Sequence, residues 1–381
     1  MNRDKELADL PYWLAVHQVL GINMTKYLHN LLQYYGSMQA LWLARDQISS
    51  TTLPENLRQK ILLARKTINP EQLWEDCQNR QVGIINCQNQ AFSKELLQIP
   101  LYPCILYYYG NVKLLQEPAI AMVGSRQCSA YGVSQAKYLA TALASQGITI
   151  VSGMAAGIDA AAHEGALAGS GGTIAVLGSG IDVPYPRENR ALYRRLCQEA
   201  LVISEFPLGA QPRKWQFPQR NRIISGLARL VLLIEAQARS GALITCDFAL
   251  EQGKEVCALP GPVTNPGSIG PLRLIQQGAK LIITPQDIIA ELKHTDLTDW
   301  SKPQKQIKFF DIDDDFEDPF VKPTLSKAEQ QLISCLTYEP MHIDFLLEQA
   351  KLERGQVYLA LSNLKHLKLI DELPGNYYLR I

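Results

Sequence analysis

Several features that mark common classes of protein are missing from this sequence of 381 residues. Its eight cysteines form no C-x-x-C pair and no histidine lies at zinc-ligand spacing, so we expect neither a metal site nor a disulfide framework. No stretch reaches the roughly 18 apolar residues that span a bilayer, and the charged N-terminal segment lacks the apolar run of a secretion signal. We therefore expect a soluble, cytoplasmic protein with reduced thiols.

The sequence also lacks the complete motifs of several nucleotide-dependent and hydrolytic enzymes. Its glycine-rich segments contain no full G-x-G-x-x-G, no G-x-x-x-x-G-K-[ST] and no G-x-S-x-G elbow. The nearest approach to a P-loop, Gly253-Lys254, is followed by Glu255 rather than by a hydroxyl residue. These absences argue against a dinucleotide-dependent redox enzyme, a P-loop ATPase and an α/β-hydrolase, and no cofactor is expected.

Net charge is missing as well, because 37 acidic residues balance 37 basic ones. A strongly basic protein that coats nucleic acid is thereby disfavoured, and any site for a polyanion must be a local patch.

The segment 213–222 is such a patch, since it contains four cations and two aromatic residues. The cations are Arg213, Lys214, Arg220 and Arg222, and the aromatic residues are Trp215 and Phe217. No Asp or Glu occurs from 206 to 234, so we expect the local positive field to stay uncancelled. Cations neutralise phosphates, and aromatic rings stack on unpaired bases for roughly 1 to 3 kcal/mol per base. The segment predicts contact with a single-stranded nucleic acid, with solvated cations and core aromatics as the alternative.

Hydrophobic periodicity divides the first 295 residues into two regions. Residues 1–90 show helical spacing and little strand signal, which predicts a small helical domain. A glycine turn at Gly21 is like that of a helix-hairpin-helix unit, although a simple helix cap gives the same pattern. From 91 to 295, short β-branched runs alternate with helices, which is typical of an α/β, Rossmann-like domain with a mostly parallel sheet covered on both faces.

The expected strands of this second region are 105–109, 119–123, 149–152, 173–177, 201–204, 230–234, 256–258 and 280–283. The expected helices are 131–146, 158–168, 187–200, 241–252, 272–277 and 286–292. The basic segment 213–222 is expected on a loop that leads into a short helix before strand 230–234.

The C-terminal part of the chain predicts a linker and a third domain. Residues 296–323 combine three prolines with an acidic block and are interpreted as the linker. Within 324–381, three helices (327–337, 343–350 and 354–367) precede an extended pair (369–373 and 377–381), which is the winged-helix plan. The third helix is only modestly basic, so this domain could contact a protein as readily as DNA.

Small residues follow four of the expected strands at their carboxyl ends, where open parallel sheets bind ligands. The four turns are Gly124-Ser125-Arg126, Ser152-Gly153 and onward to Gly157, Gly178 to Gly180, and Ser240-Gly241. Glycine lets backbone amides approach a phosphate, and the following helix adds its positive end. We expect these turns to form an anion groove with Arg126 at its mouth. Asp159 and His163 lie one helical turn apart, where an acid-base pair is possible but bracing of the helix is more usual.

Taken together, these motifs resemble the DNA-processing protein A family, called DprA or Smf. The matching segments cover about 190 residues in order: VGSR (123–126), YG (131–132), SGMAAGIDAAAH (152–163), AVLGSGID (175–182), YP (185–186), SEFP (204–207), FPQRNRIISGL (217–227), EA (235–236), RSGALIT (239–245) and PG (260–261). The helical and winged-helix flanks agree with the longer members of that family.

The resemblance implies a non-enzymatic protein that binds single-stranded DNA during natural transformation. It implies displacement or bypass of single-strand binding protein, loading of the RecA recombinase, and a homodimer formed through the Rossmann-like domain. In that picture Arg126, Lys214 and Arg220 hold phosphates, and Phe217 stacks or wedges between bases. Gly124, Ser125, Ser152, Gly153 and Asn221 supply backbone or polar contacts, and Gly178, Arg222 and Ser240 complete the candidate DNA-binding residues.

Two other functions remain open on the sequence. The fold resembles that of lysine-decarboxylase-like phosphoribohydrolases, which carry P-G-G-x-G-T followed by a catalytic glutamate. The corresponding segment here, 239–245, lacks the proline, the paired glycines and the acid, and Glu235 precedes it. A sensor that binds a small nucleotide without hydrolysing it is the third possibility.

Overall fold

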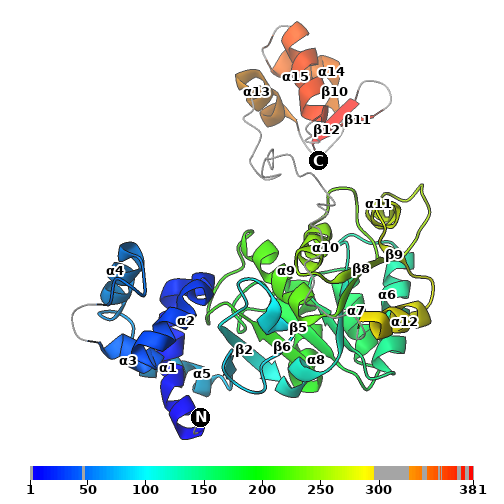
Figure 1. Ribbon diagram of the computed structural model, residues 1–381. Helices are drawn as coiled ribbons and strands as arrows, with labels where there is room; N and C mark the ends of the chain where they lie inside the picture. The colour runs from blue at the N-terminus through cyan, green and yellow to red at the C-terminus, as the bar shows by residue number, and fades with distance from the viewer. Residues whose placement is uncertain are drawn as a thin grey trace. The chain divides into compact units, whose positions relative to one another are not determined.

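The computed structural model describes residues 3–44, 48–295, 326–336, 341–350, 352, 354–366, 370–373 and 377–380. They fall into two compact units, one within Met1–Phe309 and one within Phe310–Ile381 (Figure 1). Each unit has a hydrophobic core of its own. The expected linker, 296–323, lies outside the described residues.

The larger unit is built around a nine-stranded sheet with the order β1-β2-β6-β5-β4-β3-β7-β8-β9. The strands are β1 (Gly83–Asn86), β2 (Ile105–Gly110), β3 (Ala119–Val123), β4 (Thr149–Ser152), β5 (Thr173–Leu177), β6 (Leu201–Ser204), β7 (Leu230–Leu233), β8 (Glu255–Ala258) and β9 (Lys280–Leu281). Strands β1 and β6 each pair with β2 in the antiparallel sense, and the other pairs of this sheet are parallel. The sheet confirms the expected mostly parallel α/β class.

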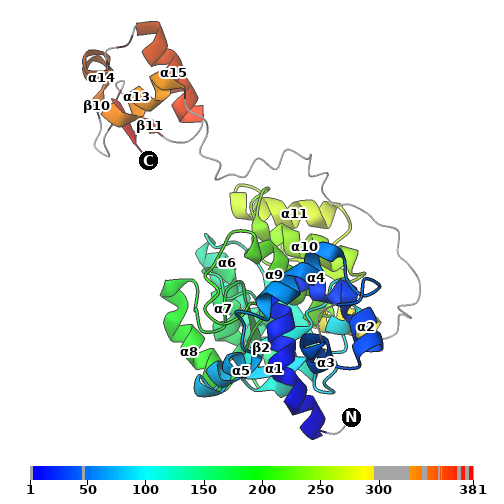
Figure 2. The ribbon, with the colours of Figure 1, turned by 90° about the vertical axis from the view of Figure 1, so that its left-hand side faces the viewer.

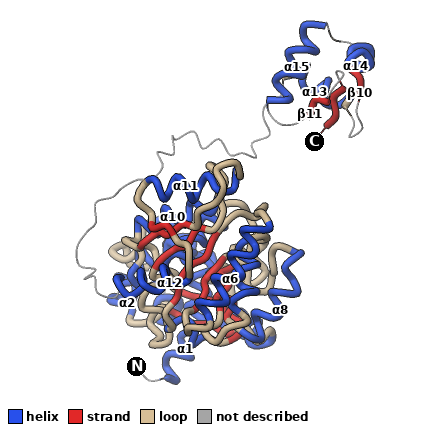
Figure 3. Tube along the Cα trace, turned by 90° about the vertical axis from the view of Figure 1, so that its right-hand side faces the viewer, coloured by secondary structure: helices blue, strands red, loops and turns tan. Residues whose placement is uncertain are grey.

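Helices cover both faces of this sheet, so strands β3 to β7 are buried along their whole length (Figure 3). The helices are α6 (Ala130–Ala144), α7 (Ile158–Ala166), α8 (Arg190–Glu199), α9 (Gln216–Leu227), α10 (Gly241–Glu251), α11 (Ile269–Gln276) and α12 (Pro285–Thr295). On one face α6, α7 and α12 pack against Ile120, Met122 and Ile150. Alternate strand residues point to the other face. There α9 crosses β5, β4 and β3, and α10 lies against β7 and β8.

Helix α9 begins earlier than the sequence predicts. We expected a loop over most of 213–222, but the helix starts at Gln216, so Phe217, Arg220 and Arg222 lie in its first two turns. Pro218 is compatible with this position because the amides of a helix's first turn have no intrahelical acceptor. The aromatic and basic side chains therefore project from a rigid crossover helix that spans the strands beneath it.

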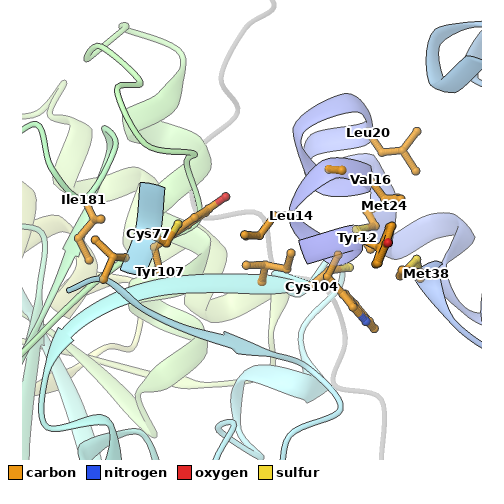
Figure 4. Close-up of a cluster of buried hydrophobic side chains, with 14 of the residues drawn as sticks. Tyr12, Leu14, Val16, Leu20, Met24, Met38, Cys77, Cys104, Tyr107 and Ile181 are labelled. Atoms are coloured by element: carbon orange, nitrogen blue, oxygen red, sulfur yellow. The ribbon is translucent and has the colours of Figure 1, made fainter. Parts of the chain in front are cut away.

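The N-terminal helices share one hydrophobic core with the sheet. They are α1 (Arg3–Leu20), α2 (Met24–Tyr35), α3 (Met38–Leu43), α4 (Glu55–Ala64) and α5 (Pro70–Asn79), and Figure 2 shows them side by side. Leu14 and Met24 belong to the same buried cluster as Tyr107 of β2 and Cys77 of α5 (Figure 4). Strand β1 lies within the region where we expected only helices, so the sheet begins before residue 90. The boundary between a helical and a Rossmann-like domain stays a prediction.

The smaller unit has the winged-helix plan that the sequence predicts. Its elements are α13 (Lys327–Cys335), β10 (Met341–His342), α14 (Ile343–Gln349), α15 (Arg354–His366), β11 (Ile370–Leu373) and β12 (Tyr377–Arg380). The structure adds β10, which pairs with β12 and makes a three-stranded sheet. Leu332, Leu346 and Leu364 bring the three helices together in its core. Residues 374–376, between the two expected extended segments, lie outside the described residues.

Two properties of the described residues bear on the expectations from composition. None of the described helices is long and apolar enough to cross a membrane. Within the described ranges, no three His, Cys, Asp or Glu side chains gather in a way that suits a metal ion.

His163 lies inside the larger unit and does not pair with Asp159. Its side chain is fully buried, and Nδ1 lies 2.8 Å from Thr173 Oγ1 on β5. Asp159 instead accepts hydrogen bonds from the amides of Gly153 and Ala155. Burial, reinforced by the charge of Arg220, lowers the pKa of His163 to about 3. The imidazole is therefore neutral in the folded protein and braces α7 against β5, and no acid-base pair forms.

We predict that His163 makes the protein acid-labile. Below the ordinary histidine pKa of 6.5, His163 binds a proton in the unfolded chain, whereas in the folded protein it stays unprotonated down to about pH 3. The free energy of unfolding should therefore fall as the pH falls from 6.5, by about 2 kcal/mol at pH 5 from this residue alone. Urea unfolding at pH 7 and pH 5 should show a smaller difference for His163→Gln. The exposed His29→Gln serves as the control, and an equal difference in wild type and His163→Gln would contradict the assignment.

Candidate nucleic-acid interface

The chain order of the strands places a switch point beside β3. From β3 the chain adds β4, β5 and β6 on one side, and then crosses through α9 to add β7, β8 and β9 on the other. In open α/β sheets, ligands bind outside the carboxyl ends of the strands near such a point. The four glycine-containing turns follow β3, β4, β5 and β7, which are neighbours in the sheet. The structure thus brings the four predicted turns to one edge.

A groove of about 230 Å³ lies at this edge. It is lined by Arg126, Gln127, Gly153, Ala155, Ala156, Gly178, Tyr185, Pro186, Glu188, Phe217 and Arg220. Five of the predicted site residues are therefore brought together: Arg126, Gly153, Gly178, Phe217 and Arg220. They come from the turns after β3, β4 and β5 and from the start of α9.

Phe217 forms the aromatic wall of this groove. Its ring centroid lies 5.5 Å from that of Tyr185 at a tilt of 45°, and the Arg126 guanidinium carbon lies 5.4 Å from the Phe217 centroid. Gly178 faces the same ring, and a Cβ atom there would come within 2.9 Å of it. The glycine is therefore needed for the close approach of Phe217. A half-buried ring beside an exposed arginine suits a base and its phosphate.

Arg220 closes the floor of the groove. The residue is 4% exposed, and its Nη1 atom donates to the carbonyl of Gly153 at 2.6 Å and to that of Val176. Burial and the neighbouring charge of Arg126 lower the pKa of Arg220 to about 10, and Asp159 opposes the shift. The guanidinium stays charged at neutral pH. Arg126 adds a second cation at the groove, but the attraction of Arg220 to Asp159 outweighs its repulsion from Arg126.

The backbone amides of these turns do not form the expected phosphate cradle. The amides of Gly153 and Ala155 donate to the Asp159 carboxylate at 3.1 and 3.3 Å, and the amide of Ser125 donates to the Glu235 carbonyl. At the start of α6, the Ser129 amide donates to the Glu235 carboxylate at 2.8 Å. Carboxylates of the protein therefore occupy the N-terminal ends of α6 and α7, where an external anion would otherwise bind. The predicted amide-lined groove is wrong at these positions, and phosphate contacts are left to exposed side chains.

The expected uncancelled field of segment 213–222 also needs correction. Arg222 is 5% exposed and forms a 2.5 Å ion pair with Glu205, which is 3% exposed and lies one residue outside the window that lacks acids. The charge of Asp159 likewise offsets part of the positive charge of Arg220. The exposed cations of the segment are Arg213 and Lys214. Arg222 is thus held in a structural ion pair beneath the surface.

The other seven predicted residues are not part of the described lining of the groove: Gly124, Ser125, Ser152, Lys214, Asn221, Arg222 and Ser240. Ser152 is buried and donates to the Met122 carbonyl, and Ser240 caps α10. Asn221 approaches the Gly241 carbonyl at 3.4 Å. Lys214 is exposed in the turn before α9. Whether these seven contact DNA stays a prediction.

Tyr185 and Glu188 are groove residues that sequence reasoning missed. Tyr185 is 40% exposed and stands against Phe217. Its dipeptide with Pro186 carries part of the family resemblance, but no spacing rule connects it to Phe217, 32 positions further along the chain. Only the packing of α9 over β5 brings the two rings together.

Two family models match this sequence. The model for DNA recombination-mediator protein A matches residues 83–293, and that for the DprA winged helix domain matches residues 317–376. Protein Smf from Synechocystis is 34% identical over 391 residues, covering 97% of this chain and 98% of that protein. DNA processing protein DprA from Streptococcus pneumoniae is 47% identical over 205 residues, covering 54% of this chain and 72% of that protein.

Two solved structures resemble the present one. The structure of DNA processing protein A from Streptococcus pneumoniae superposes with a TM-score of 0.65 at 35% identity, covering 74% of this chain and 97% of that chain. DNA processing protein A from Helicobacter pylori superposes with a TM-score of 0.52 at 30% identity, covering 56% of this chain and 96% of that chain. The Helicobacter pylori structure is described as revealing the single-stranded DNA binding mode of that protein.

We predict that the Arg222–Glu205 pair stabilises the fold in a way that the groove cations do not. Removing one partner of a buried ion pair leaves an unpaired charge and typically costs about 3 to 5 kcal/mol. Arg222→Met should lower the free energy of urea unfolding by about that amount, and the double variant Arg222→Met/Glu205→Met should recover most of it. Arg126→Ala, at an exposed position, should change stability by less than about 0.5 kcal/mol. Equal losses for Arg222→Met and Arg126→Ala would contradict this division.

Proposed function

The chain belongs to the DNA recombination-mediator protein A family, DprA or Smf, and from that premise we propose that it binds single-stranded DNA in the groove at the carboxyl ends of β3, β4 and β5. In this proposal it acts in the cytoplasm as a homodimer on DNA taken up during natural transformation. It displaces or bypasses single-strand binding protein and loads RecA onto the strand. Its role is binding and delivery rather than catalysis.

The observation that carries the proposal is the joint position of Arg126 and Phe217. Their cation-π contact of 5.4 Å places a permanent charge beside an aromatic face at the mouth of one groove. A nucleotide of a single strand offers a phosphate and an unstacked base to such a pair. A duplex hides its base faces, so the same groove should take a single strand in preference.

Delivery to RecA and dimer formation rest on family membership. The matches extend over 97% of this chain for a whole-length relative, so the helical and winged-helix regions are included. A dimer would present two grooves to one strand. Once one groove holds the strand, the second groove meets the same strand at a high effective concentration, which raises the overall affinity.

The phosphoribohydrolase alternative depends on a free acid near segment 239–245, and Glu235 does not provide one. Its carboxylate accepts from the amide of Ser129 at 2.8 Å and from the Ser129 hydroxyl at 2.5 Å, and Asn265 lies 3.4 Å away. Glu235 therefore anchors the start of α6. The sensor alternative is weakened by the same contact, because this carboxylate holds the helix end that a nucleotide phosphate would use.

We predict that single-strand binding separates into a stacking and a charge contribution. Fluorescence anisotropy with a labelled strand should show that Phe217→Ala weakens binding by about 5- to 150-fold, the loss of one base stack. Arg126→Ala should reduce the slope of log K against log salt by about 0.7, the value for one phosphate of a single strand. Lys214→Ala should reduce it similarly.

A matched control for the charge contribution is Arg195→Ala. Arg195 lies on α8, pairs with Glu199 and has an exposed side chain outside the groove, so its removal should leave the salt slope unchanged. A duplex that binds as tightly as the single strand, or equal slopes for Arg126→Ala and Arg195→Ala, would reject the groove as the site.

We predict, as a separate matter, that the protein accelerates RecA filament formation on a strand already coated with single-strand binding protein. The lag before filament growth should shorten with wild type and return to the value without protein for Arg126→Ala/Phe217→Ala, because delivery requires the strand to be held. Sedimentation of wild type should show a dimer. An undiminished effect of the double variant would show that loading does not use this groove.

A further inference from the structure

Two cysteines lie opposite each other at the end of the β1–β2 pair. These strands are antiparallel, and Asn86 is the partner of Ile105. One residue further along the same register, Cys87 lies opposite Cys104, and the Cys87 amide donates to the Cys104 carbonyl at 3.0 Å. Hydrogen-bonded residues opposed in this way have Cα atoms about 5.5 Å apart, and disulfides join Cα atoms about 4.4 to 6.8 Å apart. The backbone therefore holds the two cysteines at a separation that a disulfide can span.

The two thiols also meet. Side chains of directly opposed residues lie on the same face of a sheet, and here the Cys104 thiol donates a hydrogen bond to Cys87. On its other side, the Cys104 sulfur lies 3.3 Å from Oγ1 of Thr25 on α2. The hydrogen bond with Cys87, followed by burial, raises the pKa of Cys104 far above the ordinary thiol value. Cys104 thus keeps its proton at neutral pH, and both cysteines are free thiols in this structure.

The two thiols differ in their access to solvent. Cys104 is 2% exposed and belongs to the buried cluster that joins α1 and α2 to the sheet (Figure 4). Cys87 is half-buried. A small oxidant from solvent therefore reaches Cys87 first, and Cys104 lies behind it as a second thiol. An accessible thiol beside a resolving thiol is common in redox-sensitive proteins, and cytosolic disulfides are mostly of this transient kind.

The loop between the two cysteines, 88–103, supports helix α9. It contains the short helix η2 (Leu96–Gln98). Leu96 and Ile99 are buried, and their side chains stand so close to Gly226, near the end of α9, that a Cβ atom there would come within 2.9 and 2.8 Å of them. A covalent bond across the base of this loop would restrict its opening, because it limits the conformations that the loop can adopt when it separates.

We propose that Cys87 and Cys104 form a reversible oxidation site, which hydrogen peroxide converts into a disulfide that closes the loop 88–103. The inference does not depend on DNA binding, because neither cysteine belongs to the described lining of the groove.

The reaction takes two balanced steps. The Cys87 sulfur attacks one peroxide oxygen: an S–O bond forms, the O–O bond breaks, and the thiol proton leaves with the second oxygen as water. The Cys104 sulfur then attacks the Cys87 sulfenic acid: the S–S bond forms, the S–O bond breaks, and the Cys104 proton leaves with the hydroxyl as water. The two sulfurs are oxidised and the peroxide is reduced to water. A dithiol reductant reverses the reaction by thiol–disulfide exchange.

The test oxidises the folded full chain with hydrogen peroxide and compares it with the reduced chain. After the remaining thiols are blocked, mass spectrometry should find the peptides of Cys87 and Cys104 joined and lighter by two hydrogens than their sum. Dithiothreitol should separate them. The oxidised protein should melt about 5 °C higher than the reduced one, because the loop is closed in the unfolded chain as well. Amide hydrogen exchange within 88–103 should slow by about 10-fold.

Other cysteines of the chain are matched controls. Cys128 is half-buried like Cys87, but it interacts with Glu235 rather than with a second cysteine, so it should enter no disulfide. Cys246 and Cys257 are neighbours of each other and are fully buried, so they should stay reduced for as long as the protein is folded.

Two variants separate the steps. Cys87→Ser, at the half-buried position, should abolish the disulfide, the rise in melting temperature and the slower exchange. Cys104→Ala leaves Cys87 without a resolving thiol, so peroxide should carry Cys87 on to the sulfinic acid. Cys128→Ser should behave as wild type does. Oxidation of wild type should leave the affinity for single-stranded DNA unchanged.

The proposal is overturned if Cys87 and Cys104 remain unlinked at a peroxide concentration that oxidises the thiols of the unfolded chain. A Cys246–Cys257 disulfide that forms at the same rate would also overturn it, because oxidation would then follow unfolding. A Cys87–Cys104 bond without any change in melting temperature or hydrogen exchange would remove the loop-closing role. Absence of single-strand binding in the reduced and the oxidised protein alike would overturn the proposed function and leave the oxidation site standing.

Discussion

The buried guanidinium of Arg220 is the contact on which the geometry of the groove depends. It draws together the carbonyls of Gly153 and Val176, at the ends of two parallel strands, and attaches them to the second turn of α9. A crossover helix has no backbone hydrogen bonds to the strands it crosses, so side-chain contacts must fix its rotation. Because Phe217 lies one turn before Arg220, the same contact sets Phe217 against Gly178 and Tyr185. The aromatic wall is thus positioned by an arginine that solvent hardly reaches.

The second constraint is that the fold neutralises its own anion sites. Helix N-termini at a parallel sheet edge attract phosphates, and doubly wound proteins commonly use them for nucleotides. Here the Glu235 carboxylate lies at the start of α6, and the Asp159 carboxylate takes the amides before α7. A small nucleotide thereby loses its strongest contact. The exposed Arg126 beside an aromatic ring instead suits a single strand, which offers many phosphates and unstacked bases.

Sequence reasoning succeeded where local pattern decides the outcome and failed where distant segments meet. Strands 119–123, 149–152, 173–177 and 201–204 were predicted to the residue, because short buried apolar runs between glycine turns leave little freedom. The start of α9 was missed because Pro212 and Pro218, on either side of Trp215 and Phe217, suggested a loop, whereas Pro218 lies in the first turn of the helix. Glu205 lies one residue before the acid-free segment 206–234, and its pairing with Arg222 depends on how β6 and α9 pack. The contact of Tyr185 with Phe217 likewise arises only when α9 packs over the sheet. The cavity between the end of α1 and the start of α9 also forms only through tertiary contacts.

A chain of zero net charge faces a particular problem in holding a polyanion. Long-range attraction is weak, and each exposed cation contributes a salt-dependent increment that physiological ionic strength reduces. Stacking does not suffer this loss, and here two aromatic residues, Trp215 and Phe217, flank the start of one helix and open toward different cavities. Under the proposed function, affinity then comes mostly from short-range contacts that form and break one base at a time. Such contacts suit a protein that must release the strand to a recombinase, because RecA can take over successive nucleotides without overcoming the whole binding energy at once.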